Sequence, residues 1–519
     1  MRKVYIYLMM LLATACYEDK GNYDYTSLQD LTIGLTYDTY ERGIGSQLQI
    51  DPIVATDIDD SDLDWQWEIG TYSEEHDGYW NFVKFAEGRK LDYTCKLGGY
   101  FEAPGTYRLR LHARQKSSER SFYSPVVTLS LISQLSGLVV LHGNEQECDI
   151  ALLKASDFLV NEGSVETSLN AHCYSDASGE KIPGKGISII QANTNYLYNV
   201  DMAFVVAITD QTGVWASYAD LSKGGDWNSM FLPGINKGNP QFYDVQEQHI
   251  YAVDDGQIFP RTNSFSLFPI PSEPLSAYDA GSRLFYTSGK VQGFFFDKLS
   301  RGFIVTTNTY GLAVFSSNAG DYVKSFPTTG AGAKFNIAGM NADLVYVDKG
   351  GVNEHFLAVM KDDAGEYFLA ELAWNAATDD EVAYARYDVN TLPGVPDAKF
   401  WAFGDSQQTM CYYATADKVY RFTANPSLAL ASGELTTDNG EKIVFDGEIT
   451  MMKVLKPAVT SGSLGVNYYN RNKILLVGVY KDGQGTLYSL KIKQATGNVE
   501  SYTTYSGFDR IYDANIKGI

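Results

Sequence analysis

The sequence predicts an all-β protein in which an immunoglobulin-like β-sandwich is followed by a β-propeller. Three observations lead to this fold class. Between residues 31 and 133, apolar and polar residues alternate with the period of strands that bury one face. From 136 to 519, short β-rich apolar runs recur between turn residues. Helical periodicity is almost absent from both regions.

The composition fits a chain that buries large cores and repels polyanions. Hydrophobic residues make up 45% of the 519 residues, which is ample for globular domains. Asp and Glu number 63 against 41 Lys and Arg, a formal net charge of −22. Such a surface repels phosphate backbones and anionic headgroups, so we expect no nucleic-acid partner and membrane contact only through a lipid anchor.

The first element is a signal peptide over residues 1–15. Arg2 and Lys3 precede an apolar run, Val4–Leu12, that ends in small residues. In a helix this run spans only about 14 Å, too little to cross a bilayer. The end of the run resembles the lipobox of bacterial lipoproteins, in which Cys16 is acylated, commonly with palmitate. Ala13 stands where that pattern usually has Leu, so an ordinary signal peptide followed by an incidental cysteine is the alternative.

Residues 16–30 form the next element, a tether that carries the lipid. Glu18 and Asp19 follow Cys16 closely and resemble the acidic export signal of some Gram-negative surface lipoproteins. This resemblance implies a lipid-anchored protein exposed on the outer face of the outer membrane. The alternative interpretation of the acidic pair is a solvated spacer.

The third element, residues 31–133, is the predicted sandwich. Trp65, Trp67 and Ile69 share one face of a strand and are expected in the core. In the strand that follows Pro104-Gly105, the side chains of Arg108, Arg110 and His112 alternate with apolar residues and are expected to face water.

Three stretches of this region, 55–70, 102–115 and 121–133, resemble a PKD domain. They read ATDIDDSDLDWQWEIG, EAPGTYRLRLHARQ and SFYSPVVTLSLIS. Together with the lipoprotein start, they make the chain similar to PKD-like lipoproteins of Sus-type outer-membrane nutrient-uptake loci. The resemblance implies a surface protein that works beside a SusC/SusD-type transporter.

An acidic loop precedes the Trp-bearing strand and suggests calcium. Hard cations take several carboxylate oxygens, and Asp57, Asp59 and Asp62 are the candidate ligands. An EF-hand is excluded because its sixth position requires Gly and is Asp62 here, and because the flanking segments are strands. The alternative is an acidic surface turn.

The last element, residues 136–519, is the predicted propeller. Seven units at a spacing of about 55 residues fit four-stranded blades with some long loops. We expect seven blades, with eight as the next choice and an array of β-sandwiches as the competing geometry. The ring is expected to close where a strand near Leu138–Leu141 pairs with the C-terminal segment. The units are 137–153, 196–218, 242–260, 284–315, 342–374, 400–422 and 449–492.

Catalytic motifs are missing, and the cysteines leave one question open. The six histidines form no zinc-binding pair, and Gly179–Gly186 lacks the Ser or Thr of a phosphate loop. Cys148 and Cys173 are near neighbours in an envelope protein, where a disulfide closing this loop contributes about 3 kcal/mol. The sequence does not decide between a disulfide and free thiols.

Aromatic residues are the more informative surplus. Trp227 and Trp401 stand beside glycines and polar residues and are the candidate ligand-stacking side chains, with core packing as the alternative for each. The predicted function is a non-catalytic binding or docking platform for glycan or peptide capture. The alternatives are a polysaccharide-cleaving propeller enzyme and a structural accessory subunit of the transporter.

Overall fold

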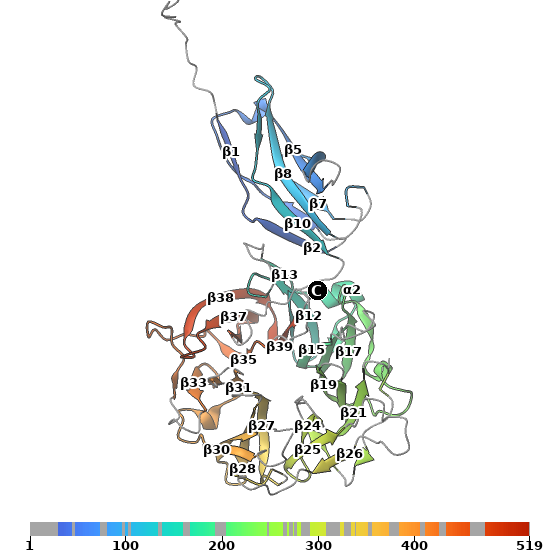
Figure 1. Cartoon of the computed structure of the whole chain (residues 1–519), viewed down its shortest axis with the longest axis vertical. Coiled ribbons are helices and arrows are strands. Elements are labelled where there is room, and N and C mark those ends of the chain that lie inside the picture. The colour runs from blue at the N-terminus through green and yellow to red at the C-terminus, as the bar shows by residue number, and fades with distance from the viewer. Residues whose placement is uncertain are drawn as a thin grey trace, which may run out of the picture. The chain divides into compact units, whose positions relative to one another are not determined.

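The computed structural model consists of two compact units. The first comprises Met1–Asp38, Ser46–Glu102 and Thr106–Leu129, and the second comprises Thr39–Gly45, Ala103–Gly105 and Ser130–Ile519. Figure 1 shows the elements of both units. The structure describes residues 30–43, 47–72, 80–95, 99–101, 105–132, 137–158, 167–192, 204–246, 249–262, 267–268, 273–274, 278–281, 291–307, 322–325, 334–337, 339–350, 355–372, 383–404, 410–424, 432–456 and 473–517. Within these ranges no helix is both long and apolar enough to cross a bilayer.

The N-terminal region is a β-sandwich around one large sheet of order β2-β10-β8-β5-β6, with β9 paired to β8. Two small sheets, β1-β4 and β3-β7, complete it. The strands are β1 (Leu31–Gly34), β2 (Thr39–Gly43), β3 (Gln47–Ile50), β4 (Ile53–Thr56), β5 (Leu63–Tyr72), β6 (Trp80–Glu87), β7 (Leu91–Thr94), β8 (Gly105–Gln115), β9 (Ser121–Tyr123) and β10 (Val127–Ile132), with a 3-10 turn η1 (Asp60–Asp62) before β5. Trp67, Leu109 and Leu129 are fully buried, as the alternation predicts, whereas Trp65, also expected in the core, is only partly buried.

The opposite face of the large sheet is more covered than the alternation predicts. Arg110 was expected to face water, but its guanidinium lies 4.0 Å from the Phe82 ring centroid and 4.3 Å from that of Tyr123. Its Nε donates to Glu68 at 2.7 Å, and His112 Nδ1 lies 2.9 Å from the same carboxylate. The prediction fails because a planar cation can stack between rings while its hydrogen bonds are satisfied by a neighbouring strand.

The second unit contains, among its described residues, seven sheets that Figure 1 shows as a ring, here called blades 1 to 7. Each blade is an antiparallel meander, apart from one short parallel pairing of β22 with β26 in blade 4. The strands of blades 1 to 3 are β39 (Arg510–Lys517), β11 (Gly137–Gly143), β12 (Glu147–Lys154), β13 (Ser168–Asn170) and β14 (Ile182–Pro183); β15 (Gly186–Ala192), β16 (Phe204–Thr209), β17 (Gly213–Ser217) and β18 (Lys223–Asp226); and β19 (Pro240–Gln246), β20 (His249–Asp254) and β21 (Gln257–Thr262).

Blades 4 to 7 follow in chain order and complete the ring. Their strands are β22 (Glu273–Pro274), β23 (Ala280–Gly281), β24 (Val291–Asp297), β25 (Gly302–Thr307) and β26 (Tyr322–Ser325); β27 (Ala342–Lys349), β28 (Phe356–Asp362), β29 (Tyr367–Leu372) and β30 (Ala383–Asp388); β31 (Phe400–Phe403), β32 (Met410–Ala414), β33 (Val419–Thr423) and β34 (Ser432–Glu434); and β35 (Glu448–Val454), β36 (Ile474–Lys481), β37 (Gln484–Ile492) and β38 (Val499–Phe508). Short helical segments are α2 (Cys173–Ser178), η4 (Trp227–Met230) and η6 (Val395–Asp397).

The ring closes as the sequence predicts. The C-terminal strand β39 pairs antiparallel with β11, with Leu138 opposite Ile516 and Val140 opposite Ala514. These residues join the buried cluster that also contains Leu476 of blade 7. One sheet is thus built from the two ends of the propeller segment, so the ring has no open seam at this point.

The second strand of several blades is buried on both faces, which explains the continuous apolar runs in the sequence. All residues of β16 are buried, as are the first six of β36.

Three successive blades also share a hydrogen bond between an aspartate side chain and the backbone. Asp210, Asp254 and Asp297 follow or end the second strand of blades 2, 3 and 4, and each accepts a backbone N–H from the segment that enters its own blade, from Lys185, Asn239 and Asp279 at 2.7, 2.7 and 2.9 Å.

Candidate functional site

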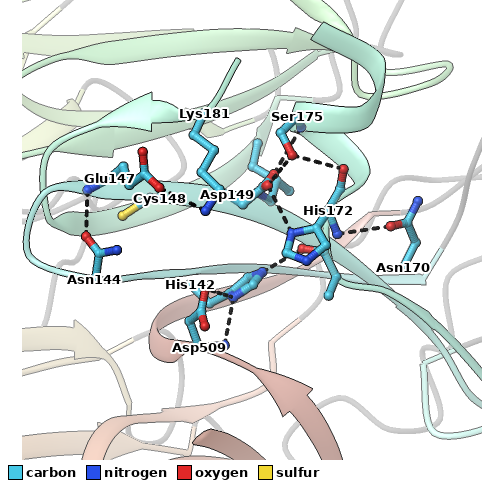
Figure 2. Close-up of polar contacts among 12 residues, drawn as sticks. His142, Asn144, Glu147, Cys148, Asp149, Asn170, His172, Ser175, Lys181 and Asp509 are labelled. Carbon is cyan, nitrogen blue, oxygen red and sulfur yellow. Dashed lines mark hydrogen bonds and ion pairs between the residues drawn. The ribbon is translucent and has the colours of Figure 1, made fainter. Parts of the chain in front are cut away.

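Blade 1 contains a cluster of polar side chains from four separate segments (Figure 2). His142 comes from β11, Asp149 from β12, Ser175 from α2, and Asp509 from the link between β38 and β39. His172 immediately precedes α2. This cluster brings imidazole, carboxylate and hydroxyl groups together, so its chemistry decides whether blade 1 can act as a catalytic centre.

Asp149 organises one half of the cluster. Its carboxylate is 1% exposed and accepts hydrogen bonds from the Ser175 N–H at 3.1 Å and from the Ser175 hydroxyl. His172 Nδ1 lies 3.4 Å from the same carboxylate, and the His172 side chain is about half exposed. Asp149 therefore serves as the acceptor for the first turn of α2, a position at which negative charge is stabilising.

His142 organises the other half and is held as a neutral imidazole. Its Nε2–H donates to the carbonyl oxygen of Ala171 at 2.7 Å, and its Nδ1 accepts from the Asp509 N–H at 3.0 Å. Burial lowers the pKa of His142, and the nearby Ala171 carbonyl and Asp509 carboxylate only partly oppose this effect. Both ring nitrogens are occupied, so this histidine holds the residue that precedes β39 against β11.

The hydrogen-bond order in the cluster does not activate a nucleophile. A catalytic serine needs an imidazole as its base, but the Ser175 hydroxyl donates to a carboxylate and contacts no histidine ring nitrogen in the described hydrogen bonds. The Cys148 thiol donates to the Gly184 carbonyl oxygen at 3.1 Å, and burial raises the pKa of this thiol to about 12. The residues fit a structural network in which the side chains of His172 and Asp509 are about half exposed.

No group of three or more His, Cys, Asp or Glu side chains among the described residues is arranged to hold a metal ion. Asp57, Asp59 and Asp62, the predicted calcium ligands, are therefore not arranged as such a group. Asp57 accepts from the Asp30 N–H, Asp59 from the N–H and hydroxyl of Ser61, and Asp62 from the side chains of Gln115 and Ser117. The three carboxylates thus bind three different segments of the chain, and their hydrogen bonds lower the pKa of Asp59 and Asp62.

Trp227 lies in the core and not in a groove. Its side chain is 2% exposed, its Nε1–H donates to Asp254 at 2.9 Å, and it packs against Phe231 and Tyr243. The polar neighbours in the sequence suggested an exposed loop. They form instead the short β18 and the turn η4, which place the ring in a buried cluster with residues of blade 3. No face of the ring is open, so the predicted stacking role is withdrawn.

Trp401 is also buried and gives no ligand platform. It is 2% exposed and lies against the Tyr413 ring at 5.2 Å between centroids, in the cluster shared by blades 5 and 6. Core packing, the stated alternative, accounts for it. Cys148 and Cys173 are both free and buried, so the structure contains no Cys148–Cys173 disulfide. The predicted acylation site, Cys16, lies outside the described residues.

No sequence pattern predicted the blade 1 cluster. His142 and Asp509 are separated by 367 positions, and Asp149 and His172 by 23, which matches no ligand or triad spacing. Only ring closure brings them together, because Asp509 precedes the strand that pairs with β11. The predicted closure was therefore the one available signal, although it named no residue of the cluster.

Comparison with known proteins gives one family match and several distant structural ones. A model of the PKD-like family matches residues 16–186. A quinonprotein alcohol dehydrogenase-like protein from Bacteroides thetaiotaomicron is 10% identical, with a TM-score of 0.35 over 92% of this chain and 96% of that one. A DUF4784 family protein from Bacteroides caccae is 10% identical, with a TM-score of 0.26 over 93% and 98%. Comparison with curated proteins gives no match.

The family match covers the sandwich and all of the first blade except β39. It ends at Gly186, the first residue of β15, so it includes β11, β12 and α2 and every labelled residue of Figure 2 except Asp509. The structural matches show no more than a distant likeness. Over residues 16–186, about a third of the chain, the protein is similar to the PKD-like family.

Proposed function

We propose that the protein is a non-catalytic lipoprotein of the outer membrane, anchored through Cys16 and exposed at the cell surface. In this proposal the propeller is a platform that captures glycans or peptides for a SusC/SusD-type transporter. The supporting observation is a set of exposed apolar side chains on the central strands of the ring. The polar network of blade 1 adds indirect support, since its serine and cysteine are not activated.

Bulges recur in the central strands of the propeller. Figure 1 places β15, β27, β35 and β39 on the central side of the ring. A central strand has a one-residue register shift in five of the blades as described, each in the first half of the strand. The extra residues are Tyr512, Ile187, Gln241, Val345 and Thr450.

A bulge turns a side chain away from the regular pleat. For this reason bulges are frequent beside functional sites. Ile187 and Val345 are 48% and 42% exposed, although the strands next to them are almost wholly buried. Exposed apolar side chains at equivalent places of different blades offer a surface for uncharged, partly apolar ligands. This surface carries the proposal.

A binding experiment tests the platform. The soluble fragment 17–519 is applied to glycan and peptide arrays, and the hits are measured by calorimetry. Ile187→Glu combined with Val345→Glu should weaken binding at least tenfold, because charge replaces the apolar contact. Val444→Glu is the matched control, since Val444 is 77% exposed and lies outside the central strands. Equal affinity of the double variant and wild type would contradict the proposal that this surface binds the ligand.

Two further measurements address the rest of the proposal. Incubation with each bound glycan should release no smaller products over time, and accumulation of products would make the protein an enzyme. Cys16→Ser should move the protein from the membrane fraction to the soluble fraction. A Cys16→Ser variant that still sediments with detergent-free membranes would contradict the lipid anchor.

A further inference from the structure

A buried carboxylate in blade 5 holds two side chains at once. Glu371 on β29 is 5% exposed. His355, which directly precedes β28, places Nδ1 2.6 Å from one oxygen of Glu371, and the Tyr387 hydroxyl donates to the other oxygen at 2.6 Å. Both oxygens of the carboxylate are thus engaged by strong hydrogen bonds.

This geometry sets the tautomer of His355. A carboxylate oxygen accepts hydrogen bonds and donates none, so Nδ1 of the neutral imidazole carries the hydrogen and Nε2 keeps its lone pair. No described residue forms a hydrogen bond with Nε2, and the His355 side chain remains 14% exposed. An imidazole oriented from behind in this way presents an acceptor for an incoming O–H or N–H donor.

Tyr384 lies beside His355. The pairing of β29 with β30 skips one residue between Leu372–Ala383 and Glu371–Ala385, so Tyr384 is the extra residue of a bulge. Its side chain is 39% exposed, and its ring lies 4.7 Å from the His355 ring at an angle of 58°. An open aromatic face therefore stands beside an open acceptor.

His142 and His355 differ in whether a ring nitrogen is left without a described hydrogen bond. His142 in blade 1 has both nitrogens occupied by backbone groups, as expected for a structural role. His355 has one nitrogen fixed by a buried carboxylate and the other open, with an exposed ring next to it. A purely structural network does not require the second arrangement.

We propose that His355 and Tyr384 form a ligand site for a neutral sugar residue of a glycan. The apolar face of the sugar stacks on Tyr384, and one of its hydroxyl groups donates to His355 Nε2. A neutral ligand fits because the chain carries a net charge of −22, which repels anions. The site rests on the proposed function and deepens it by naming the ligand class. It lies apart from the platform residue Val345, because His355 follows the end of β27 and Val345 is in the first half of that strand.

Calorimetry on fragment 17–519 tests this site with three neutral probes: cellohexaose, maltohexaose and mannohexaose. Tyr384→Ala and His355→Ala should each weaken binding of a recognised hexasaccharide at least tenfold. Tyr384→Phe should keep wild-type affinity, since the ring is retained. Tyr502→Ala is the matched control because Tyr502 is a 52% exposed tyrosine on β38 of blade 7. Thermal unfolding of each variant shows whether it is folded.

The outcomes separate this site from the platform. Loss of binding in the blade 5 variants, with Tyr502→Ala unchanged, supports the sugar site. Folded Tyr384→Ala and His355→Ala with wild-type affinity overturn it, even when Ile187→Glu with Val345→Glu shows that the platform binds. Failure of all three neutral probes, or preference for hexagalacturonate, also overturns it, while peptide binding would leave the proposed function intact.

Discussion

The sandwich and the propeller bury polar groups in opposite ways. In the sandwich, Glu68 meets Arg110 and His112 from a neighbouring strand, within 44 positions along the chain. In the propeller, His142 meets Asp509 across 367 positions. The first network can form as soon as a local sheet forms, whereas the second requires both ends of the propeller segment. We infer that the sandwich is stabilised locally and that the propeller depends on closure.

The largest expected effect comes from removing the closing strand. Deletion of residues 510–519 removes β39, including the buried Ile511, Ala514 and Ile516. Each of the two buried isoleucines contributes about 1.5–3 kcal/mol, and a domain has only about 5–15 kcal/mol in total. Scanning calorimetry should show loss of the propeller transition and retention of the sandwich transition. An unchanged propeller transition would show that closure is dispensable.

Core tryptophans give the next largest effect and test whether the regions unfold separately. Trp67 is 0% and Trp227 2% exposed. Replacing either by Ala should destabilise its own region by about 3–5 kcal/mol, because a large cavity is created. Trp67→Ala should lower only the sandwich transition and Trp227→Ala only the propeller transition. If either variant shifts both transitions equally, the two regions form one cooperative unit.

Glycines under aromatic rings give an intermediate effect in both regions. A Cβ on Gly70 would lie 2.9 Å from Phe82, and a Cβ on Gly224 would overlap the Trp215 ring. Gly70→Ala must displace Phe82 from Arg110, and Gly224→Ala must displace Trp215, at about 1–3 kcal/mol each. Gly433→Ala is the control, since a Cβ there meets no atom within 4 Å. Urea unfolding in which all three variants match wild type would refute this packing role.

The smallest expected effect is a difference in acid sensitivity. Burial lowers the pKa of His142 from 6.5, so its contribution is complete above pH 6.5 and decreases as the pH falls below this value, where the unfolded state binds the proton. Burial alone would raise the pKa of Glu68, but hydrogen bonds from Arg110, Gln66 and His112 lower it overall from 4.5. Its contribution is complete above pH 4.5 and is lost as the pH falls further.

Urea titrations from pH 8 to pH 3 measure this difference. The difference in unfolding free energy between wild type and His142→Gln should narrow as the pH falls below 6.5. The gap between wild type and Glu68→Gln should stay constant until about pH 4.5 and then narrow. Identical pH profiles for the two gaps would contradict the assignment of the two networks.

Much of the fold could be predicted because it depends on periodicity. Alternation placed Trp67 and Leu109 in the sandwich core, and repeated apolar runs gave the seven sheets and their closure through β11. Both patterns are local properties of strands that recur along the chain. The open parts of the surface were harder to predict, because exposure of Trp227 or Arg110 depends on which blade or ring covers it.

The sequence by itself determined the all-β character, the acidic surface, the order of the two regions and the segment that closes the ring. Tertiary structure alone decided which polar groups meet. It buried Trp227 and Trp401, gave Asp57, Asp59 and Asp62 different hydrogen-bond partners, and joined His142 to Asp509 and His355 to Glu371. The physical reason is that strand formation follows from neighbours in sequence, whereas a side-chain cluster in a ring of blades is assembled from residues whose separation along the chain carries no information about distance.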